Sequence, residues 1–224
     1  MNPGPFALFK WEAVLAEWPV FAIGLGTTAL VSVLALVLSL LLGLAFGMAG
    51  ASKSKGLRGP SRLYVELFQN TPLVIQIFFL YNGLPYMGLV LPVLSVGVLG
   101  VGIYHGAYVA EIVRAGIAAV PRGQKEAAMS QGFNPWQTMA HVVLPQTRKV
   151  VLPPLANQAV FLIKNTSVLA MVAGGDLMYQ ADSWAAGNLY YGPAYVVTGL
   201  LYLALCLPLS RWVRRLEKKG GVQA

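Results

Sequence analysis

Charged residues, cysteine and nucleotide-binding motifs are scarce or missing in this sequence. Only 11% of the 224 residues are charged, whereas soluble domains carry about a quarter, so a soluble globular protein is excluded. The single cysteine, Cys206, cannot form a disulfide within the chain, and no GxxxxGKS/T motif for binding ATP occurs. His105 and His141 have no further ligand residue at metal-binding spacing, and no nucleophile–base arrangement is visible. We therefore expect no enzymatic site, no metal and no cofactor in this chain.

Hydrophobic residues, in contrast, fill long uncharged stretches. They make up 57% of the chain, and the mean hydropathy is +0.64. No charged residue occurs between Pro19 and Ser52, and the charge-free stretch between Glu66 and Glu111 can hold two helices of about 20 residues each. We predict an all-α integral membrane protein with a single domain, residues 1–224. Its five transmembrane helices are expected near residues 19–48, 63–84, 91–116, 150–173 and 194–213.

The positions of the basic residues predict the orientation of these helices. The net charge is +8, and the basic residues gather in the first loop, in the loop between the third and fourth spans, and in the C-terminal tail. Loops rich in Lys and Arg remain cytoplasmic, so we predict the N-terminus outside and the C-terminus in the cytoplasm. Because these charges lie at the ends of apolar runs and not in one stripe, nucleic acid is not an expected partner.

Two segments are expected on the outer side of the membrane. Residues 6–18 alternate apolar and polar positions at helical spacing, which favours a short helix lying on the membrane surface. Residues 174–193 have no basic residue and carry Asp176 and Asp182. We expect them to form a solvated loop, the alternative being that the two aspartates contact an external binding protein.

The polar segment 122–145 carries clear helix signals. Arg122–Gln131 contains good helix formers and is followed by Gly132 at a C-cap position. Asn134 is a favoured N-cap, Pro135 suits the first helical position, and Gln137 completes a capping box. The pair Leu144-Pro145 is expected to break the second helix. Two short, capped helices with a tight elbow between them are typical of a rigid surface that a partner binds.

This segment resembles the EAA loop of ABC-importer permeases. The matching positions are Glu126, Ala127, Ala128, Gly132, Val142, Leu144 and Pro145. The one departure is Val142, where Ile is most common. The resemblance implies cytoplasmic coupling helices that dock on a separate ATPase subunit, with Glu126 accepting hydrogen bonds from the ATPase or capping its own helix. It also implies a bacterial inner-membrane location, a second permease copy or a homologous permease, an extracytoplasmic solute-binding protein, and surrounding membrane lipids. ATP would be bound by the partner ATPase.

Three further segments resemble the permeases of polar amino-acid importers, the histidine/glutamine/glutamate type. The segments are Glu66–Gln76 in the second span, Gly106–Ile117 in the third and Ile163–Leu169 in the fourth. Gln69 stands where this family commonly has Arg, and Asn165 stands where it has Asp. The resemblance implies an amino-acid substrate, while the identity of that amino acid, and whether the dimer is homo- or heteromeric, stay open.

Several polar residues at membrane depth are candidates for the substrate pathway. Lys164 lies 14 residues beyond Val150, roughly 20 Å into the bilayer, where an ammonium group must be paired or solvated. It either binds the substrate carboxylate or has a structural role. In the second span, Gln69, Asn70, Leu73 and Gln76 recur at helical spacing and are expected to share one face, which lines the pathway or forms hydrogen bonds between helices. Thr166 and Ser167 are weaker candidates, because such hydroxyls often bond back to their own helix.

The sequence therefore predicts a membrane-spanning permease subunit of an ATP-driven importer of polar amino acids. Two alternatives are a proton-coupled secondary transporter and an importer permease for a different small solute. A secondary transporter would use Lys164 or Glu66 for proton coupling, but it predicts internal repeats and more helices than this chain has. A membrane scaffold without transport activity would have little use for a lysine and polar residues at membrane depth.

Overall fold

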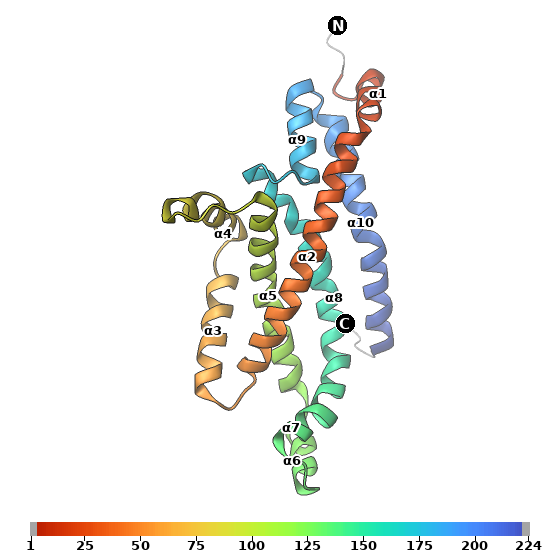
Figure 1. Ribbon diagram of the computed structural model, residues 1–224. Helices are drawn as coiled ribbons and strands as arrows, with labels where there is room; N and C mark the ends of the chain where they lie inside the picture. The colour runs from red at the N-terminus through yellow and green to blue at the C-terminus, as the bar shows by residue number, and fades with distance from the viewer. Residues whose placement is uncertain (1–3, 221–224) are drawn as a thin grey trace. The chain divides into compact units, whose positions relative to one another are not determined.

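The computed structural model describes residues 4–220, and all regular elements within that range are helical (Figure 1). In chain order they are α1 (Leu8–Ala16), α2 (Trp18–Gly50), α3 (Lys55–Gln69), α4 (Leu73–Phe78), η1 (Phe79–Gly83), η2 (Leu84–Met87), α5 (Val93–Ala119), α6 (Arg122–Ser130), α7 (Pro135–Thr138), η3 (Met139–Val143), α8 (Leu144–Asn165), η4 (Thr166–Val172), α9 (Leu177–Asn188) and α10 (Tyr191–Gly220). The predicted all-α class is confirmed. The short helix predicted at residues 6–18 is present as α1, and its place on the membrane surface stays a prediction.

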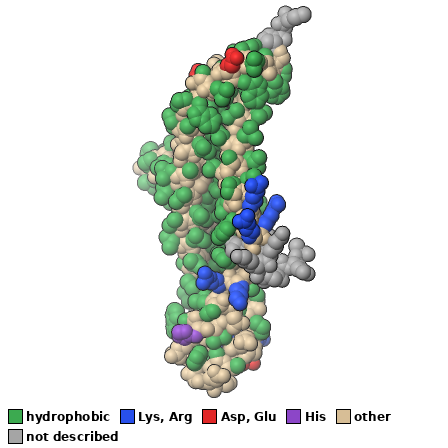
Figure 2. All heavy atoms as spheres, turned by 90° about the vertical axis from the view of Figure 1, so that its right-hand side faces the viewer, with side chains coloured by type: hydrophobic (Ala, Val, Ile, Leu, Met, Phe, Trp, Pro, Cys, Tyr) green, Lys and Arg blue, Asp and Glu red, His purple; other side chains and the backbone are tan. Residues whose placement is uncertain are grey.

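Four or five membrane spans are present among the described residues, depending on how one bent pair of helices is counted. Four helical stretches are long and apolar enough to cross a membrane, namely Trp18–Gly50, Val93–Ala119, Pro135–Val172 and Tyr191–Arg215. The broken pair Lys55–Gln69 and Leu73–Met87 makes a fifth when it is counted as one span. Hydrophobic side chains cover most of the face shown in Figure 2, with lysines and arginines gathered in a few places, as expected for a surface in contact with lipid. The orientation predicted from the charges stays a prediction.

The contacts within the chain define two compact units, which are described separately. The first unit contains residues 4–37, 72–102 and 161–208, and the second contains residues 38–71, 103–160 and the chain from residue 209. The long helices α2, α5 and α8 each contribute one part to each unit. Whether residues 1–224 fold as a single domain stays a prediction.

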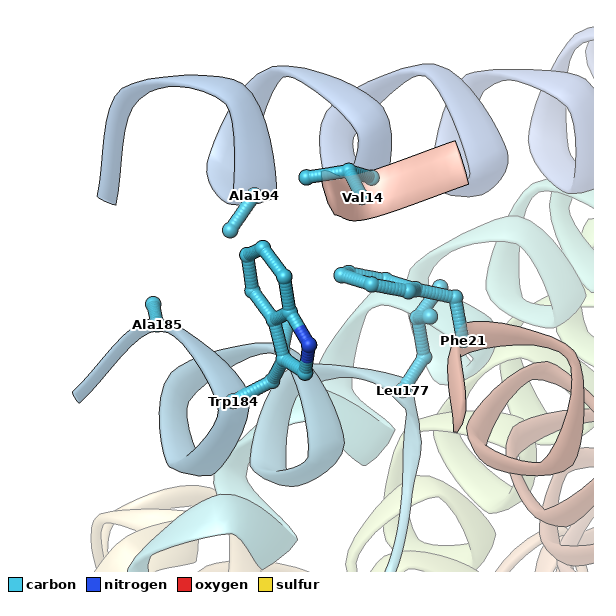
Figure 3. Close-up of a cluster of buried hydrophobic side chains, with 7 residues drawn as sticks. Val14, Phe21, Leu177, Trp184, Ala185 and Ala194 are labelled. Atoms are coloured by element: carbon cyan, nitrogen blue, oxygen red, sulfur yellow. The ribbon is translucent and has the colours of Figure 1, made fainter. Parts of the chain in front are cut away.

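The hydrophobic core of the first unit is built around one tryptophan. Trp184 of α9 packs edge to face against Phe21 of α2, with ring centroids 5.6 Å apart, and Val14 of α1 and Ala194 of α10 complete the cluster (Figure 3). The indole N–H of Trp184 donates a hydrogen bond to Glu17 Oε2 at 3.0 Å. An aromatic pair with a satisfied indole contributes both buried apolar area and fixed geometry. The core therefore holds α1 and α9 against the ends of α2 and α10.

The expected solvated loop at residues 174–193 is wrong, because most of it forms α9. Ala173 and Gly175 take left-handed φ values of 54° and 67°, which reverse the chain after η4. Asp176 then caps the new helix, and its Oδ2 accepts a hydrogen bond from the Met178 N–H at 3.0 Å. The first backbone N–H of α9, that of Leu177, donates to the Thr28 hydroxyl of α2 at 3.0 Å. The Asp176 side chain, expected in solvent, is completely buried.

The burial of Asp176 has a consequence for stability. Burial raises the pKa of its carboxyl from 3.8 to about 6, although the Met178 N–H opposes the shift. Because the folded state binds this proton more tightly than the unfolded state, the associated stability is complete below 3.8 and is lost as pH rises through about 6.

The variant Asp176→Asn keeps an N-capping oxygen and removes the charge. Near neutral pH we expect it to unfold at a higher temperature than the wild type, with a gain in stability of up to about 3 kcal/mol. The gain should disappear in acidic buffer, where the wild-type carboxyl is protonated. Thermal unfolding in detergent at both pH values measures this, with the exposed Asp182→Asn as the control. Equal unfolding midpoints of Asp176→Asn and the wild type near neutral pH would contradict the argument.

The second unit is held together by close packing between helices. Glycines on α2 allow α5 to approach closely, because a Cβ on Gly43 would lie 2.1 Å from Val109 Cγ1. The buried side chains of α5, Val109, Val113 and Ile117, pack with Val143 and Val151. Small residues at helix contacts are the usual means of packing helices in membranes. This packing supports the segment that joins α5 to α8.

Candidate coupling loop and translocation site

The segment between α5 and α8 folds as the sequence predicts at its elbow. Helix α6 ends in a Schellman motif, in which the Gly132 N–H donates to Met129 O at 3.0 Å and the Phe133 N–H donates to Ala128 O at 3.1 Å. Gly132 has a φ of +88°, a value that glycine adopts without steric cost. The turn between α6 and α7 is therefore closed by backbone hydrogen bonds and by one glycine.

The second helix is capped as predicted. The side chain of Asn134 accepts a hydrogen bond from the Gln137 N–H, and the Gln137 side chain accepts one from the Asn134 N–H, both at 2.9 Å. With Pro135 at the first helical position, the start of α7 is fixed by its own sequence.

Removing the Asn134 cap should loosen the elbow. In Asn134→Ala we expect a loss of about 1 kcal/mol of local stability and roughly fivefold faster hydrogen exchange of the backbone amides in α7. Hydrogen exchange read by mass spectrometry measures this. The control is Ser130→Ala, because the Ser130 hydroxyl bonds only to the Glu126 carbonyl of its own helix. Equal exchange in the two variants would show that the capping box does not stabilise this elbow.

The predicted break at Leu144-Pro145 is wrong. Both residues lie at the start of α8, and helix continues from Pro135 through the wider turn η3. Proline has no N–H to donate to the carbonyl four residues earlier, that of His141, and a π turn of five residues accommodates the missing hydrogen bond. The side-chain amide of Gln146 donates to Val142 O at 2.9 Å and satisfies one of the carbonyls in this turn.

The residues of the EAA pattern differ in exposure. Ala128 is the buried residue of α6. The exposed residues of the pattern are Glu126, Ala127, Gly132, Leu144 and Pro145. The sequence analysis missed three apolar side chains on the same segment, Met129, Phe133 and Trp136, which are exposed to 45%, 36% and 84%. Exposed aromatic residues on a rigid surface are typical of a protein interface. Their unusual position in a polar segment was the signal that could have identified them.

The four candidate residues of the second span were predicted to share one helix face, and this prediction is wrong. Gln69 and Asn70 end α3, whereas Leu73 and Gln76 belong to α4, and Pro72 between them is extended, with a ψ of 135°. The Asn70 amide donates to Glu66 O at 2.7 Å, and the Thr71 hydroxyl donates to Leu67 O at 2.8 Å. These side chains add hydrogen bonds to carbonyls in the last turn of α3, and the helical spacing is lost at Pro72.

The side chains of these candidates also have different surroundings. The Gln69 amide donates to Ala107 O of α5 at 3.2 Å, which is a hydrogen bond between helices. Leu73 is buried and Gln76 is half-buried. This contact of Gln69 is of the kind that the alternative role, a hydrogen bond between helices, predicts.

Lys164 lies at the mouth of a cavity in the first unit. It occupies the last turn of α8, where a cation interacts favourably with the helix end, and its Nζ lies 4.6 Å from the centre of the Phe161 ring. The cavity has a volume of about 390 Å³ and is lined by Lys164, Ser167, Met178, Tyr195, Thr198, Gly199 and Tyr202. Four of the six residues other than Lys164 carry hydroxyl groups, and Lys164 is the one cation among the lining residues.

Thr166 and Ser167 both bond back to their own helix, as expected. Thr166 donates to Ile163 O at 2.7 Å and Ser167 donates to Lys164 O at 2.8 Å. Thr166 is fully buried and does not line the cavity, whereas Ser167 does. Tyr195, Thr198 and Tyr202 were not predicted as cavity residues. In the sequence they look like ordinary tyrosine and threonine residues near the end of a membrane span, and only the structure places them beside Lys164.

Glu111 and Arg114 form an ion pair on α5, where Arg114 Nε donates to Glu111 Oε2 at 2.8 Å. Arg62 and Glu66 form a second pair on α3 at 2.6 Å. Among residues 4–220 there is no group of three or more His, Cys, Asp or Glu side chains that could hold a metal ion.

A family model described as binding-protein-dependent transport system inner membrane component matches residues 39–220. The chain belongs to this family. It is therefore a multi-pass protein of the inner membrane and the membrane-spanning component of such a transport system.

Relatives and solved structures agree with this assignment. The chain is 44% identical to the "Probable glutamine ABC transporter permease protein GlnM" of Bacillus subtilis (strain 168), over 91% of this chain and 94% of that protein. It is 32% identical to the glutamine transport system permease protein GlnP of Escherichia coli (strain K12), over 94% and 97% of the two chains. A chain in the crystal structure of an amino acid ABC transporter with histidines superposes with a TM-score of 0.87 and is 32% identical, with coverage of 93% and 98%. The predicted relationship to permeases of amino-acid ABC importers is confirmed.

Proposed function

We propose that this chain forms the translocation pathway for polar amino acids in an ATP-driven importer. The observation that carries the proposal is the exposed, doubly capped helix pair α6–α7, whose EAA residues and apolar side chains form one rigid surface. Such a surface suits a partner that transmits a conformational change, because a rigid element passes on a displacement with little deformation. The partner is a separate ATPase, since this chain has no nucleotide-binding motif. The proposal involves no cofactor in the chain itself.

On the coupling surface, Glu126 and Ala127 are exposed and would contact the ATPase together with Trp136. Aromatic side chains often dominate the energy of such interfaces. Gly132 and Asn134 stabilise the turn between α6 and α7, and Ala128 is the buried contact of α6. Leu144 and Pro145 lead from the surface into α8.

For the pathway, the cavity at Lys164 supports an amino-acid substrate. A carboxylate that enters it would meet the ammonium group of Lys164, and charge-assisted hydrogen bonds from such a group are strong. The names of the relatives given above support glutamine or a similar polar amino acid. Gln69, Asn70, Leu73, Gln76 and Thr166 stay secondary candidates for the pathway. A second permease copy or a homologous permease and an external solute-binding protein would complete the assembly.

The direct test is uptake by proteoliposomes that contain the chain with its ATPase and binding protein. We expect uptake of a labelled polar amino acid that requires ATP inside the vesicles and is competed by glutamine. Uptake driven by an imposed proton gradient without ATP would instead support secondary transport. ATP-driven uptake of an unrelated solute, with no competition by amino acids, would refute the substrate assignment alone.

A further inference from the structure

A second cavity, of about 360 Å³, lies in the other unit between α2, α3 and α5. It is lined by Gly50, Arg58, Ser61, Arg62, Val65, Glu66, Glu111 and Arg114. Its lining from α3 follows helical spacing, so one face of α3 borders the cavity along its length. The Tyr64 hydroxyl donates to Ile103 O at 2.7 Å and keeps α3 beside α5 (Figure 1). The cavity is therefore built by the packing of three helices and not by a loop.

The lining of this cavity has more positive than negative side chains, with three arginines and two glutamates. Arg62 is paired with Glu66 on α3, and Arg114 is paired with Glu111 on α5. In the part of the chain that the structure describes, Arg58 has no carboxylate partner within ion-pair distance. Lys53 and Lys55 precede it in the sequence and add positive charge at the same end of α3. The site thus has one guanidinium available for an anion, with two more guanidinium groups nearby.

Glycine at position 50 keeps this cavity open. A Cβ at Gly50 would lie 2.8 Å from Ser61 Oγ and 3.4 Å from Arg114 Cδ. Ser61, which is buried, donates to Phe46 O at 2.7 Å and fixes α3 to the end of α2. The arginine side chains therefore border a cavity whose walls are held in place.

The depth of the cavity corresponds to the edge of the bilayer. Glu111 lies 18 residues after Val93, the first residue of α5, roughly 27 Å along the helix axis, and the hydrocarbon core is about 30 Å thick. The side of α3 opposite the cavity carries Leu57, Leu63 and Leu67, which are exposed to 55%, 67% and 54%. The cationic groups of the cavity thus lie at the depth of lipid phosphates.

We propose that this cavity binds the phosphate headgroup of an anionic phospholipid. Guanidinium groups bind phosphate oxygens through paired, charge-assisted hydrogen bonds. Basic pockets between helices at the membrane boundary recognise anionic headgroups on this basis. Free phosphate would use the same arginines, but the cavity lies at the depth where lipid phosphates are concentrated, so a phospholipid is the expected occupant. The proposal does not depend on which solute the protein transports.

The test uses the full chain, purified with the subunits that accompany it and stripped of lipid in a neutral detergent. Native mass spectrometry and titration measure the binding of phosphatidylglycerol, phosphatidylcholine, glycerol 3-phosphate and inorganic phosphate. We expect phosphatidylglycerol to bind at least tenfold more tightly than phosphatidylcholine. In Arg58→Gln its affinity should fall by about tenfold or more, the usual effect of losing a charge-assisted hydrogen bond.

Matched variants separate this site from general attraction to negative charge. Arg148→Gln removes an exposed cation of the same unit that does not line the cavity, and it should bind phosphatidylglycerol as the wild type does. Arg58→Lys keeps the charge and should retain part of the affinity. Equal losses in Arg58→Gln and Arg148→Gln, or equal binding of phosphatidylcholine, would overturn the proposal. If glycerol 3-phosphate and inorganic phosphate bind as tightly as phosphatidylglycerol, the assignment to a lipid is wrong.

Discussion

Replacing Gly132 by aspartate is expected to abolish most ATP-driven uptake while leaving the protein folded in the membrane. Within the chain nothing lies within 4 Å of a Cβ at this position, so the new side chain does not clash with its own protein. It does project from an elbow with a φ of +88° onto the surface that we propose docks on the ATPase. An unfavourable charge at such a contact costs ~2 kcal/mol or more, so uptake should fall more than tenfold.

Two further glycine variants identify the cause. Gly123→Asp adds the same charge to α6 at a position that is equally open but has no left-handed backbone, and it should retain most of the uptake. Gly132→Asn adds a neutral side chain that tolerates the left-handed conformation, and its loss should be intermediate. Uptake and ATPase activity of the reconstituted complex measure the coupling. Equal losses for Gly123→Asp and Gly132→Asp would show that charge anywhere on the segment is sufficient.

Replacing Lys164 by methionine should reduce amino-acid uptake by about ten- to hundredfold, the effect of losing one charge-assisted hydrogen bond to a carboxylate. Methionine has a similar length and keeps the contact with the Phe161 ring. The thermal unfolding midpoint should change little, because Lys164 is exposed within this chain and forms no ion pair among the described residues.

The same variant distinguishes the two roles that the sequence left open for Lys164. If it binds substrate, KM for the amino acid rises or uptake is lost, while assembly with the ATPase and basal ATP hydrolysis are unchanged. If its role is structural, the unfolding midpoint falls and uptake by the folded fraction is normal. Lys149→Met, which removes an exposed lysine that does not line the cavity, serves as the control. A normal KM together with a lower midpoint would contradict substrate binding.

The sequence predicted those features that depend on local signals. Five spans follow from charge-free runs, and the elbow at Gly132 and the capping box at Asn134 follow from residues within a few positions of each other. The EAA pattern belongs to the same class of signal, because all of its residues lie in one short segment. These local rules hold in the structure because the backbone hydrogen bonds that they describe are formed within α6 and α7 themselves.

The features that were not predicted depend on contacts between distant segments. The start of α9 is held by Asp176 together with Thr28, about 150 residues earlier in the chain. The segment 174–193 was therefore predicted as a loop, because its own residues do not show this contact. In the second span, residues at helical spacing were predicted to share one face, but the spacing does not continue through Pro72. There the side chains of Asn70 and Thr71 bond to the preceding turn, and the two helical pieces are bent by 99°. Leu144-Pro145 was read as a break, yet a π turn keeps the helix continuous there.

The cavity at Lys164 also required the structure. Lys164 was identifiable from its depth alone, but Tyr195, Thr198 and Tyr202 come from the last span and are brought to it only by folding. In the same way, Arg58 and Arg114 occur more than 50 residues apart in the sequence and line one cavity.

The central claim is that this chain couples to a separate ATPase through α6 and α7. The most direct test is affinity purification of the tagged chain from its native membranes, followed by mass spectrometry of the proteins that accompany it. We predict a stoichiometric ATPase with a GxxxxGKS/T motif in the wild type, and less of it in Gly132→Asp. Recovery of the folded wild-type chain without any ATPase would contradict the account.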